Sequence, residues 1–132
     1  MASIFTKIVQ GQIPAHKVAE DDRFYAFLDI RPLQRGHTLV IPKREVDYLF
    51  DLTPQEVGDL FIFAQRIAKA VKKAIPCKRV GVAVLGLEVP NAHIHLVPLN
   101  QERDINFSSP RCELTQEEFA QIAENISKAL DS

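Results

Sequence analysis

Residues 53–75 carry the clearest periodic pattern in the chain. Apolar side chains recur there at intervals of three and four residues, as they do on the buried face of an amphipathic helix. Thr53 stands at the N-cap position, Pro54 at the first helical position, and Glu56 three residues after the cap. In such a capping box, two side chains bind backbone N–H groups that would otherwise lack partners. The pattern therefore predicts one long helix with a defined start.

Two further helices are expected at the ends of the chain. Near the N-terminus, Ser3 is placed to cap a short helix that Gly11 can end. Near the C-terminus, Thr115 and Glu118 repeat the capping box, and apolar residues then line one face as far as Leu130. These signals predict a C-terminal helix of several turns.

Strand character is found in four segments, namely 23–29, 37–41, 80–85 and 91–97. Pro42 is expected to stop the second of them, and the alternating valines of the third indicate a buried strand. Strands and helices are mixed without regular βαβ alternation. We therefore expect a single α+β domain over residues 1–132, with a mainly antiparallel sheet of about five strands.

The overall balance of residues excludes several classes of protein. Hydrophobic residues make up 46% and charged residues 25% of the chain, as in ordinary soluble domains. The net charge of −1 argues against a nucleic-acid partner. No apolar run is long enough to span a membrane, and the N-terminal segment is too polar for a signal peptide. We expect a cytoplasmic protein with no membrane contact, in which Cys77 and Cys112 are reduced.

Polar and apolar side chains alternate in the segment 91–97. Residues two apart in a strand face the same way, so Asn91, His93 and His95 are expected to share one face. The side chains between them, which are those of Ala92, Ile94 and Leu96, are expected to face a core. The segment thus predicts a row of polar side chains on a rigid strand.

Three interpretations of these histidines remain open on the residues alone. The first is a pair of surface or hydrogen-bonded histidines. The second is a metal site that uses His37 as well, although no cysteine or carboxylate has an obvious ligand spacing. The third is nucleophilic catalysis, because a neutral imidazole attacks well near neutral pH and a second imidazole can manage protons.

The segment 89–98, in which His93 and His95 alternate with apolar residues, resembles the signature of the histidine-triad (HIT) family. Four upstream segments resemble the Hint branch of that family, namely 4–9, 13–15, 26–32 and 36–43. The resemblance covers residues 4 to 98 with few gaps, and several ordered motifs are more specific than a lone H-x-H. It implies a HIT-like domain.

Roles for individual residues follow from this resemblance. The middle histidine of the family attacks the α-phosphorus of a nucleotide, and it corresponds to His93. The last histidine, here His95, helps to hold the phosphate and the transition state, and the upstream histidine falls on His37. The acidic residue that holds the ribose hydroxyls falls on Asp29, where a carboxylate offers two charged acceptor oxygens.

The resemblance also implies a base-binding slot and a quaternary structure. The apolar slot that sandwiches the base is implied to contain Phe5, Ile8, Ile13 and Ile30. Family members usually form homodimers in which two sheets join into one, so a homodimer is expected. The scheme needs neither a metal nor another cofactor.

Two departures from the family pattern bear on activity. Asn91 stands where the first triad histidine belongs, so it keeps the backbone carbonyl that orients the middle histidine and loses only the imidazole. Before the triad, the Hint branch has Gly-Gln and a small polar residue that contacts phosphate, where this chain has Gly86-Leu87-Glu88. Leu87 cannot donate a hydrogen bond from its side chain, and Glu88 would repel a phosphate unless it turns away or contacts an amine leaving group.

These observations together lead to a functional hypothesis. We expect a hydrolase or transferase that acts on the α-phosphorus of nucleoside 5′-phosphoramidates or related conjugates, with purine nucleotides as the first substrate class. It would work through a covalent nucleotidyl-histidine, with activity reduced by Asn91. The alternatives are a nucleotide-binding protein that has lost turnover and a metal-dependent hydrolase that uses His37, His93 and His95.

Overall fold

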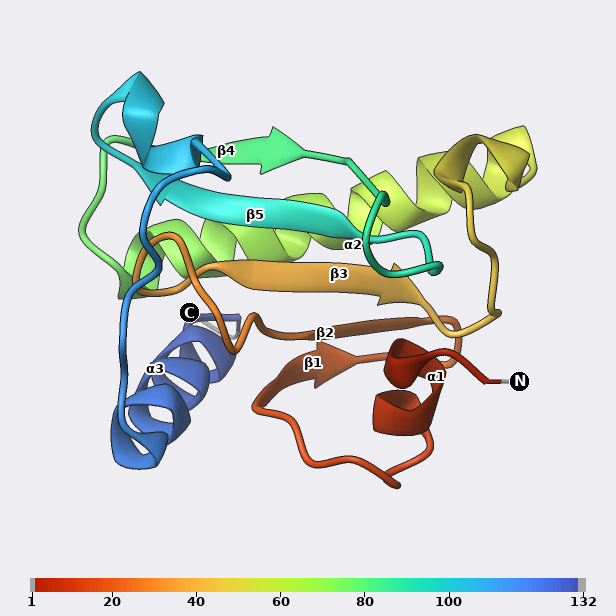
Figure 1. Cartoon of the computed structure of the whole chain (residues 1–132), viewed down its shortest axis with the longest axis horizontal. Helices are drawn as coiled ribbons and strands as arrows, with labels where there is room; N and C mark the ends of the chain where they lie inside the picture. Colours follow the sequence, from red (N-terminus) through yellow and green to blue (C-terminus); the bar gives the residue numbers. More distant parts are fainter. Residues whose placement is uncertain (1, 131–132) are drawn as a thin grey trace.

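The computed structural model describes residues 2–130 as an α+β fold built on one five-stranded sheet. The strands lie in the order β1-β2-β3-β5-β4, and all neighbouring pairs are antiparallel (Figure 1). The strands are β1 Lys17–Glu20, β2 Phe24–Leu28, β3 Thr38–Pro42, β4 Arg79–Ala83 and β5 Ile94–Leu99. The helices are α1 Ile4–Val9, α2 Pro54–Ala74 and α3 Gln116–Ala129, with 3₁₀ turns η1 Leu49–Asp51 and η2 Glu102–Ile105. The expected fold class is confirmed.

All three helices begin at the residues that the sequence indicated. Thr53 and Thr115 each accept from a backbone N–H three residues on, and Glu56 and Glu118 complete the two capping boxes. Ser3 caps α1 in the same way, without the reciprocal acidic residue. No helix within residues 2–130 combines the length and the apolar composition needed to cross a bilayer.

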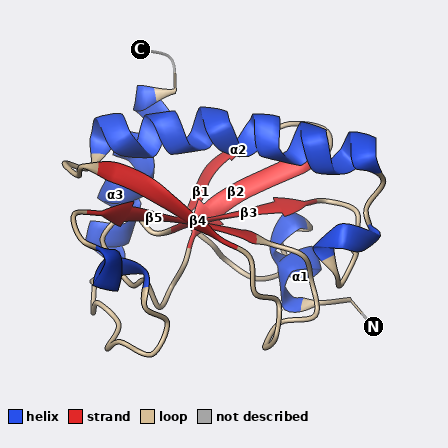
Figure 2. Ribbon diagram, turned by 90° about the horizontal axis from the view of Figure 1, so that it is seen from above, coloured by secondary structure: helices blue, strands red, loops and turns tan. Residues whose placement is uncertain are grey.

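The two faces of the sheet are covered by different helices. α2 runs along one face, while α1 packs on the opposite face (Figure 2). The larger core lies between the sheet, α2 and α3, and Leu60 and Ile67 of α2 are fully buried in it. A smaller core lies under α1, where Phe5 packs against Phe27 and its neighbours on β2 and β3.

Strand alternation explains why the histidines lie on the α1 face. On β5, Ile94 and Leu96 belong to the large core, so His95 between them faces the other way. On the neighbouring β3, Val40 belongs to the large core and Leu39 to the small one. Antiparallel pairing sets His95 opposite Leu39. The polar cluster is therefore bounded on one side by the small core.

Two expected strands have different boundaries in the structure. β5 begins at Ile94, so Asn91 and His93 precede the strand. The alternation predicted that both would lie in one strand with His95, and this prediction was wrong. The reason is that Asn91 lies in a bend, where its backbone N–H donates a hydrogen bond to Val89 O at 2.8 Å. β3 includes Pro42 as its last residue, whereas the sequence predicted that the strand would end before Pro42. β1 was not predicted, because it is short and only Val18 within it is buried.

The strand predicted to be buried, β4, lies at the edge of the sheet. Within residues 2–130 it pairs with β5 alone, so its other side has no strand neighbour there. The side chain of Val82 is 53% exposed, and Val84 and Leu85 just beyond the strand are also exposed. Alternating valines indicated a strand correctly, but they cannot tell a central strand from an edge strand that offers apolar residues to solvent or a partner.

Candidate active site

The ring of His93 is oriented by a backbone carbonyl. Its Nδ1 lies 2.6 Å from the carbonyl oxygen of Asn91, two residues earlier in the chain. Since a carbonyl oxygen only accepts, the hydrogen of the neutral ring is on Nδ1. Nε2 therefore carries a free lone pair, and it makes no hydrogen bond within residues 2–130. This is the form of imidazole that can attack an electrophile.

The histidine cluster is buried, which the predicted row of polar side chains did not indicate. Asn91 is 1% exposed, His93 6% and His95 7%. Phe5 of α1 packs edge-on against His93 with ring centroids 5.1 Å apart, and Phe107 packs edge-on against His95 at 4.7 Å. The segments before the first strand and after the last one thus cover both rings. Truncation of His93 would therefore leave a gap against Phe5.

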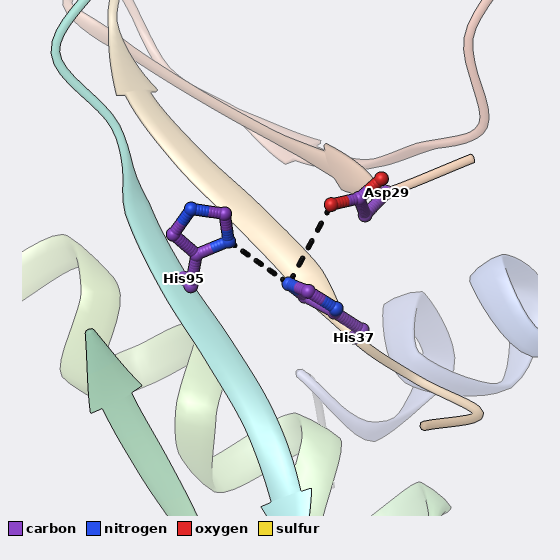
Figure 3. A group of neighbouring side chains, drawn as sticks. All are labelled: Asp29, His37 and His95. Atoms are coloured by element: carbon purple, nitrogen blue, oxygen red, sulfur yellow. Dashed lines mark hydrogen bonds and ion pairs between the residues drawn. The ribbon is translucent and has the colours of Figure 1, made fainter. Parts of the chain in front are cut away.

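A second chain of hydrogen bonds orients His95. The backbone N–H of Leu33 donates to Nδ1 of His37 at 3.0 Å, so the hydrogen of the neutral His37 ring lies on Nε2. That Nε2 is 3.0 Å from Nδ1 of His95 and donates to it (Figure 3). The hydrogen of His95 is consequently on its own Nε2. The two neighbouring imidazoles therefore differ, because Nε2 of His93 can attack and Nε2 of His95 can donate.

Burial keeps His37 and His95 neutral. Desolvation, followed by the charges of His95 and Arg111, lowers the pKa of His37 to about 3. Desolvation and then the charge of His93 lower the pKa of His95 to about 4. At neutral pH each ring therefore carries a single hydrogen, and the order of donors and acceptors described above holds.

Asp29 lies beside the histidines because the β2–β3 pairing continues past the end of β2. Its N–H bonds His37 O at 3.0 Å, and its carboxylate Oδ2 lies 3.6 Å from His37 Nε2. The other oxygen, Oδ1, accepts from Arg31 N–H at 2.8 Å. Burial raises the pKa of this carboxyl, while the Arg31 N–H and the charge of Arg111 act in the opposite direction. Oδ2 thus accepts no hydrogen bond from residues 2–130, because the His37 Nε2 hydrogen is donated to His95.

Two residues of the site were missed by the sequence reasoning, Phe107 and Arg111. They lie beyond the segment that resembles the family signature. The Arg111 guanidinium donates to Arg31 O at 2.8 Å and to Phe107 O at 3.3 Å, which ties this segment to the loop after β2. An aromatic residue and an arginine in a polar segment were the only signals available, and neither is specific.

The implied base-binding residues are brought together only in part. Phe5 and Ile8 belong to the small core under α1. Ile13 is partly buried and Ile30 is 69% exposed, and neither is part of that cluster among the residues described. Leu87 and Glu88 are exposed, on the loop that follows β4. No contact within residues 2–130 assigns Glu88 a partner.

A separate hollow lies on the opposite side of the molecule. It has a volume of about 470 Å³ and is formed by α2, the end of α3 and residues near the start of β2. Arg66 and Lys69 line it together with Phe63, and Arg23 at its edge is paired with Asp59 at 2.8 Å. None of its lining residues is a histidine, cysteine, serine or threonine, and it differs in this from the histidine cluster.

Comparison with known proteins places the chain in a family. The family model described as "HIT domain" matches residues 10–102. The chain belongs to the HIT family. It is 31% identical over 132 residues to the adenosine 5′-monophosphoramidase hnt1 of Schizosaccharomyces pombe, which covers 98% of this chain and 99% of that protein. It is 37% identical over 103 residues to the Saccharomyces cerevisiae adenosine 5′-monophosphoramidase HNT1, covering 77% and 65% of the two chains.

The fold is also that of a solved HIT protein. The crystal structure of a zinc-bound histidine triad family protein from Mycobacterium smegmatis superposes with a TM-score of 0.83 at 31% identity, covering 99% of this chain and 94% of that one. The likeness includes the C-terminal helix, which lies outside the segment matched by the HIT model.

A metal ion does not fit the histidines of this HIT domain well. Ligand atoms of Asp29, His37 and His95 do lie within 4.8 Å of one another. However, the Leu33 N–H donates to His37 Nδ1, so Nε2 of His37 bears the hydrogen and has no lone pair for a cation. Coordination of a cation by His37 Nε2 would move the ring hydrogen to Nδ1. That hydrogen would then point at the Leu33 N–H, and two donors would face each other. The grouping also replaces the expected His93 by Asp29.

The lowered pKa of His37 predicts a particular dependence of stability on pH. Folded His37 has a pKa of about 3, against 6.5 for an unperturbed histidine, so between these values the unfolded chain binds more protons. The free energy of unfolding therefore rises with pH in that window and falls as the pH drops below 6.5. One proton contributes a slope of up to about 1.4 kcal/mol per pH unit.

A His37→Asn variant tests this dependence, because the asparagine oxygen can still accept from Leu33 N–H. Urea unfolding at several pH values should give a shallower slope for the variant than for the wild type below pH 6.5. Parallel curves for the two proteins would mean that His37 titrates alike in the folded and unfolded states.

Proposed function

We propose that this HIT protein hydrolyses nucleoside 5′-phosphoramidates, or related nucleotide conjugates, at the α-phosphorus through a covalent intermediate on His93. The observation that carries the proposal is the hydrogen bond from His93 Nδ1 to the Asn91 carbonyl, which leaves Nε2 unprotonated. A neighbouring donor on His95 Nε2 supplies the second requirement, a hydrogen bond to the phosphate oxygens. Purine nucleotides remain the first substrate class to test.

The proposed reaction has two displacements. In the first, His93 Nε2 bonds to phosphorus while the P–N bond breaks, and the amine leaves with a proton taken from solvent. The imidazole then carries a positive charge, which the Asn91 carbonyl oxygen stabilises through Nδ1–H. In the second, water attacks phosphorus and loses a proton to solvent, while the bond to His93 breaks and its electron pair returns to Nε2. The nucleoside monophosphate is then released. His95 donates to the phosphoryl oxygens in both steps.

Asp29 and α1 are proposed to hold the nucleoside. The free oxygen of the Asp29 carboxylate would accept from a ribose hydroxyl, while Phe5 and Ile8 would contact the base. The names of two yeast relatives, both adenosine 5′-monophosphoramidases, favour this substrate class. Asn91 takes part through its backbone, so its side chain is not required to move a proton.

The proposal includes a homodimer formed through the edge of the sheet. β4 offers an unpaired strand edge within residues 2–130 with Val82 exposed, and Val84 and Leu85 just beyond the strand are exposed as well. A second copy that pairs symmetrically along this edge would extend the sheet and cover apolar surface.

The first prediction concerns the nucleophile. His93→Ala should lower turnover of adenosine 5′-phosphoramidate by about 10³-fold or more, since no other group would form the intermediate. His93→Gln, which fills more of the space against Phe5, serves as the matched control for folding and should be equally inactive. A chelator should not change the wild-type rate.

Other outcomes of the same assay would identify the alternatives. Loss of wild-type activity in chelator would indicate a metal-dependent hydrolase. Nucleotide binding by the wild type without release of monophosphate would indicate a binding protein.

The second prediction concerns the ribose. Asp29→Ala should weaken binding of the nucleoside monophosphate by about 1–3 kcal/mol, the scale of a hydrogen bond to a charged group. Asp29→Asn keeps an acceptor for Arg31 N–H and isolates the effect of the charge. Titration calorimetry with ribo- and 2′-deoxyribonucleotides should show weaker binding of the deoxy form by the wild type. Equal affinities for the two sugars would remove Asp29 from this role.

The third prediction concerns assembly. Light scattering at micromolar concentration should give the mass of two chains for the wild type. Val82→Lys should shift the population towards the monomer, because the symmetric interface would bury the lysine charges of both copies close to each other. A single-chain mass for the wild type would contradict the homodimer.

A further inference from the structure

The carbonyl that orients His93 belongs to a residue outside the sheet. Asn91 lies in a bend before β5, so no strand pairing fixes its position. A carbonyl that sets the tautomer of a nucleophile must nevertheless keep its position to within a fraction of an ångström. The structure therefore has to fix Asn91 by other contacts.

Those contacts come from the start of α1. The Ser3 hydroxyl donates to Asn91 Oδ1 at 2.8 Å, across 88 residues of sequence. At the other end of the same amide, Nδ2 donates to Ala92 O at 3.2 Å, and Ala92 N–H in turn bonds Val46 O at 2.6 Å. With a side chain bonded at both ends and almost fully buried, Asn91 has one position available to it.

We propose that Ser3 is a positioning residue for the nucleophile, acting through the Asn91 side chain on the carbonyl that binds His93 Nδ1. The proposal rests on the proposed function, in which His93 attacks phosphorus. It assigns the asparagine side chain a structural partner, where the sequence analysis considered only the loss of an imidazole.

Ser3 is itself held by an exposed carboxylate. Glu45 Oε1 accepts from the Ser3 backbone N–H at 2.5 Å and from the Thr6 hydroxyl at 2.6 Å. The Thr6 N–H donates back to Ser3 Oγ at 3.1 Å, which is the N-cap bond of α1. That bond uses an oxygen lone pair of Ser3, so the Ser3 hydroxyl hydrogen is still available. It has two acceptors within reach, Asn91 Oδ1 at 2.8 Å and Thr6 Oγ1 at 3.2 Å, and the contact with Asn91 is the shorter.

The same turn of α1 also contacts the His93 ring directly. Phe5 lies between Ser3 and Thr6 in sequence and meets the ring at an interplanar angle of 84°. One helical turn therefore contacts the nucleophile twice, through its ring and through its orienting carbonyl. Loss of the Ser3–Asn91 bond alone would change the direction of attack while α1 and its proposed base contacts stay in place.

The test separates positioning from simple helix capping. Ser3→Gly removes the hydroxyl, while glycine is tolerated at N-caps, and Ser3→Thr keeps both the hydroxyl and the cap. Asn91→Ala removes the acceptor but keeps the backbone carbonyl. Thr115→Gly is the matched control, because it removes the N-cap of α3 away from the site. Steady-state rates with adenosine 5′-phosphoramidate would be measured for these variants, for the Ser3→Gly/Asn91→Ala double variant and for His93→Ala.

Positioning predicts a specific pattern of rates. Ser3→Gly and Asn91→Ala should each lower kcat by roughly 3- to 10-fold with KM within about 2-fold, since geometry at the reacting atoms changes and nucleoside contacts do not. The double variant should be no slower than the slower single variant, because both remove the same link. Ser3→Thr and Thr115→Gly should keep the wild-type kcat.

The opposite results are equally distinct. If Ser3→Gly keeps the wild-type kcat while His93→Ala is inactive, the positioning role is wrong and the proposed function stands. If the two losses multiply, or KM rises in step with the fall in kcat, Ser3 only caps α1 and the proposal is also wrong. If His93→Ala turns over normally, the proposed function itself fails.

Discussion

The hydrogen bond between His93 Nδ1 and the Asn91 carbonyl is the interaction on which the site depends. It determines which nitrogen of the ring is bare, and it provides an oxygen that faces positive charge as that charge develops on the imidazole. A side-chain acceptor could rotate away or become protonated. A backbone carbonyl held at a fixed place in the fold can do neither. The path of the main chain therefore determines which nitrogen of His93 can react.

A second backbone group gives His95 the opposite character. The Leu33 N–H acts through His37 and leaves a hydrogen on His95 Nε2, while the Asn91 carbonyl removes one from His93 Nε2. The arrangement at His37 and His95 requires that both rings are neutral. Both rings contact Phe107, and burial lowers their pKa values and so keeps them neutral. The fold thus controls the protonation of these two histidines by covering them with the segment that follows the last strand.

Much of the fold could be predicted from local patterns. Capping boxes placed the starts of α2 and α3, because the side chains and the backbone groups that they bind are three residues apart. The alternation at Ile94, His95 and Leu96 correctly separated a core face from a polar face. What failed depended on distant partners. Whether β4 is central or at the edge, and whether the histidines are open or covered, is decided by strand order and by packing of α1 and the 107–112 segment.

The same distinction applies to the candidate site. Sequence reasoning named His37, His93, His95 and Asp29 through the family resemblance, and the structure brings their side chains together. It could not find Ser3, Phe107 or Arg111 as neighbours of the cluster, since each is joined to it only by contacts across long stretches of chain. Nor could it show that the Asn91 side chain is bonded to Ser3, because nothing in the local pattern at 91 indicates a direction for that amide.

The most direct test of this account is the tautomeric state of the three imidazoles. Long-range ¹H–¹⁵N correlation spectra of the ¹⁵N-labelled protein at neutral pH distinguish a ring protonated at Nδ1 from one protonated at Nε2. The account predicts that His93 carries its hydrogen on Nδ1, while His37 and His95 carry theirs on Nε2. A spectrum in which the His93 hydrogen is on Nε2 would contradict it, because the proposed nucleophilic nitrogen would then have no free lone pair.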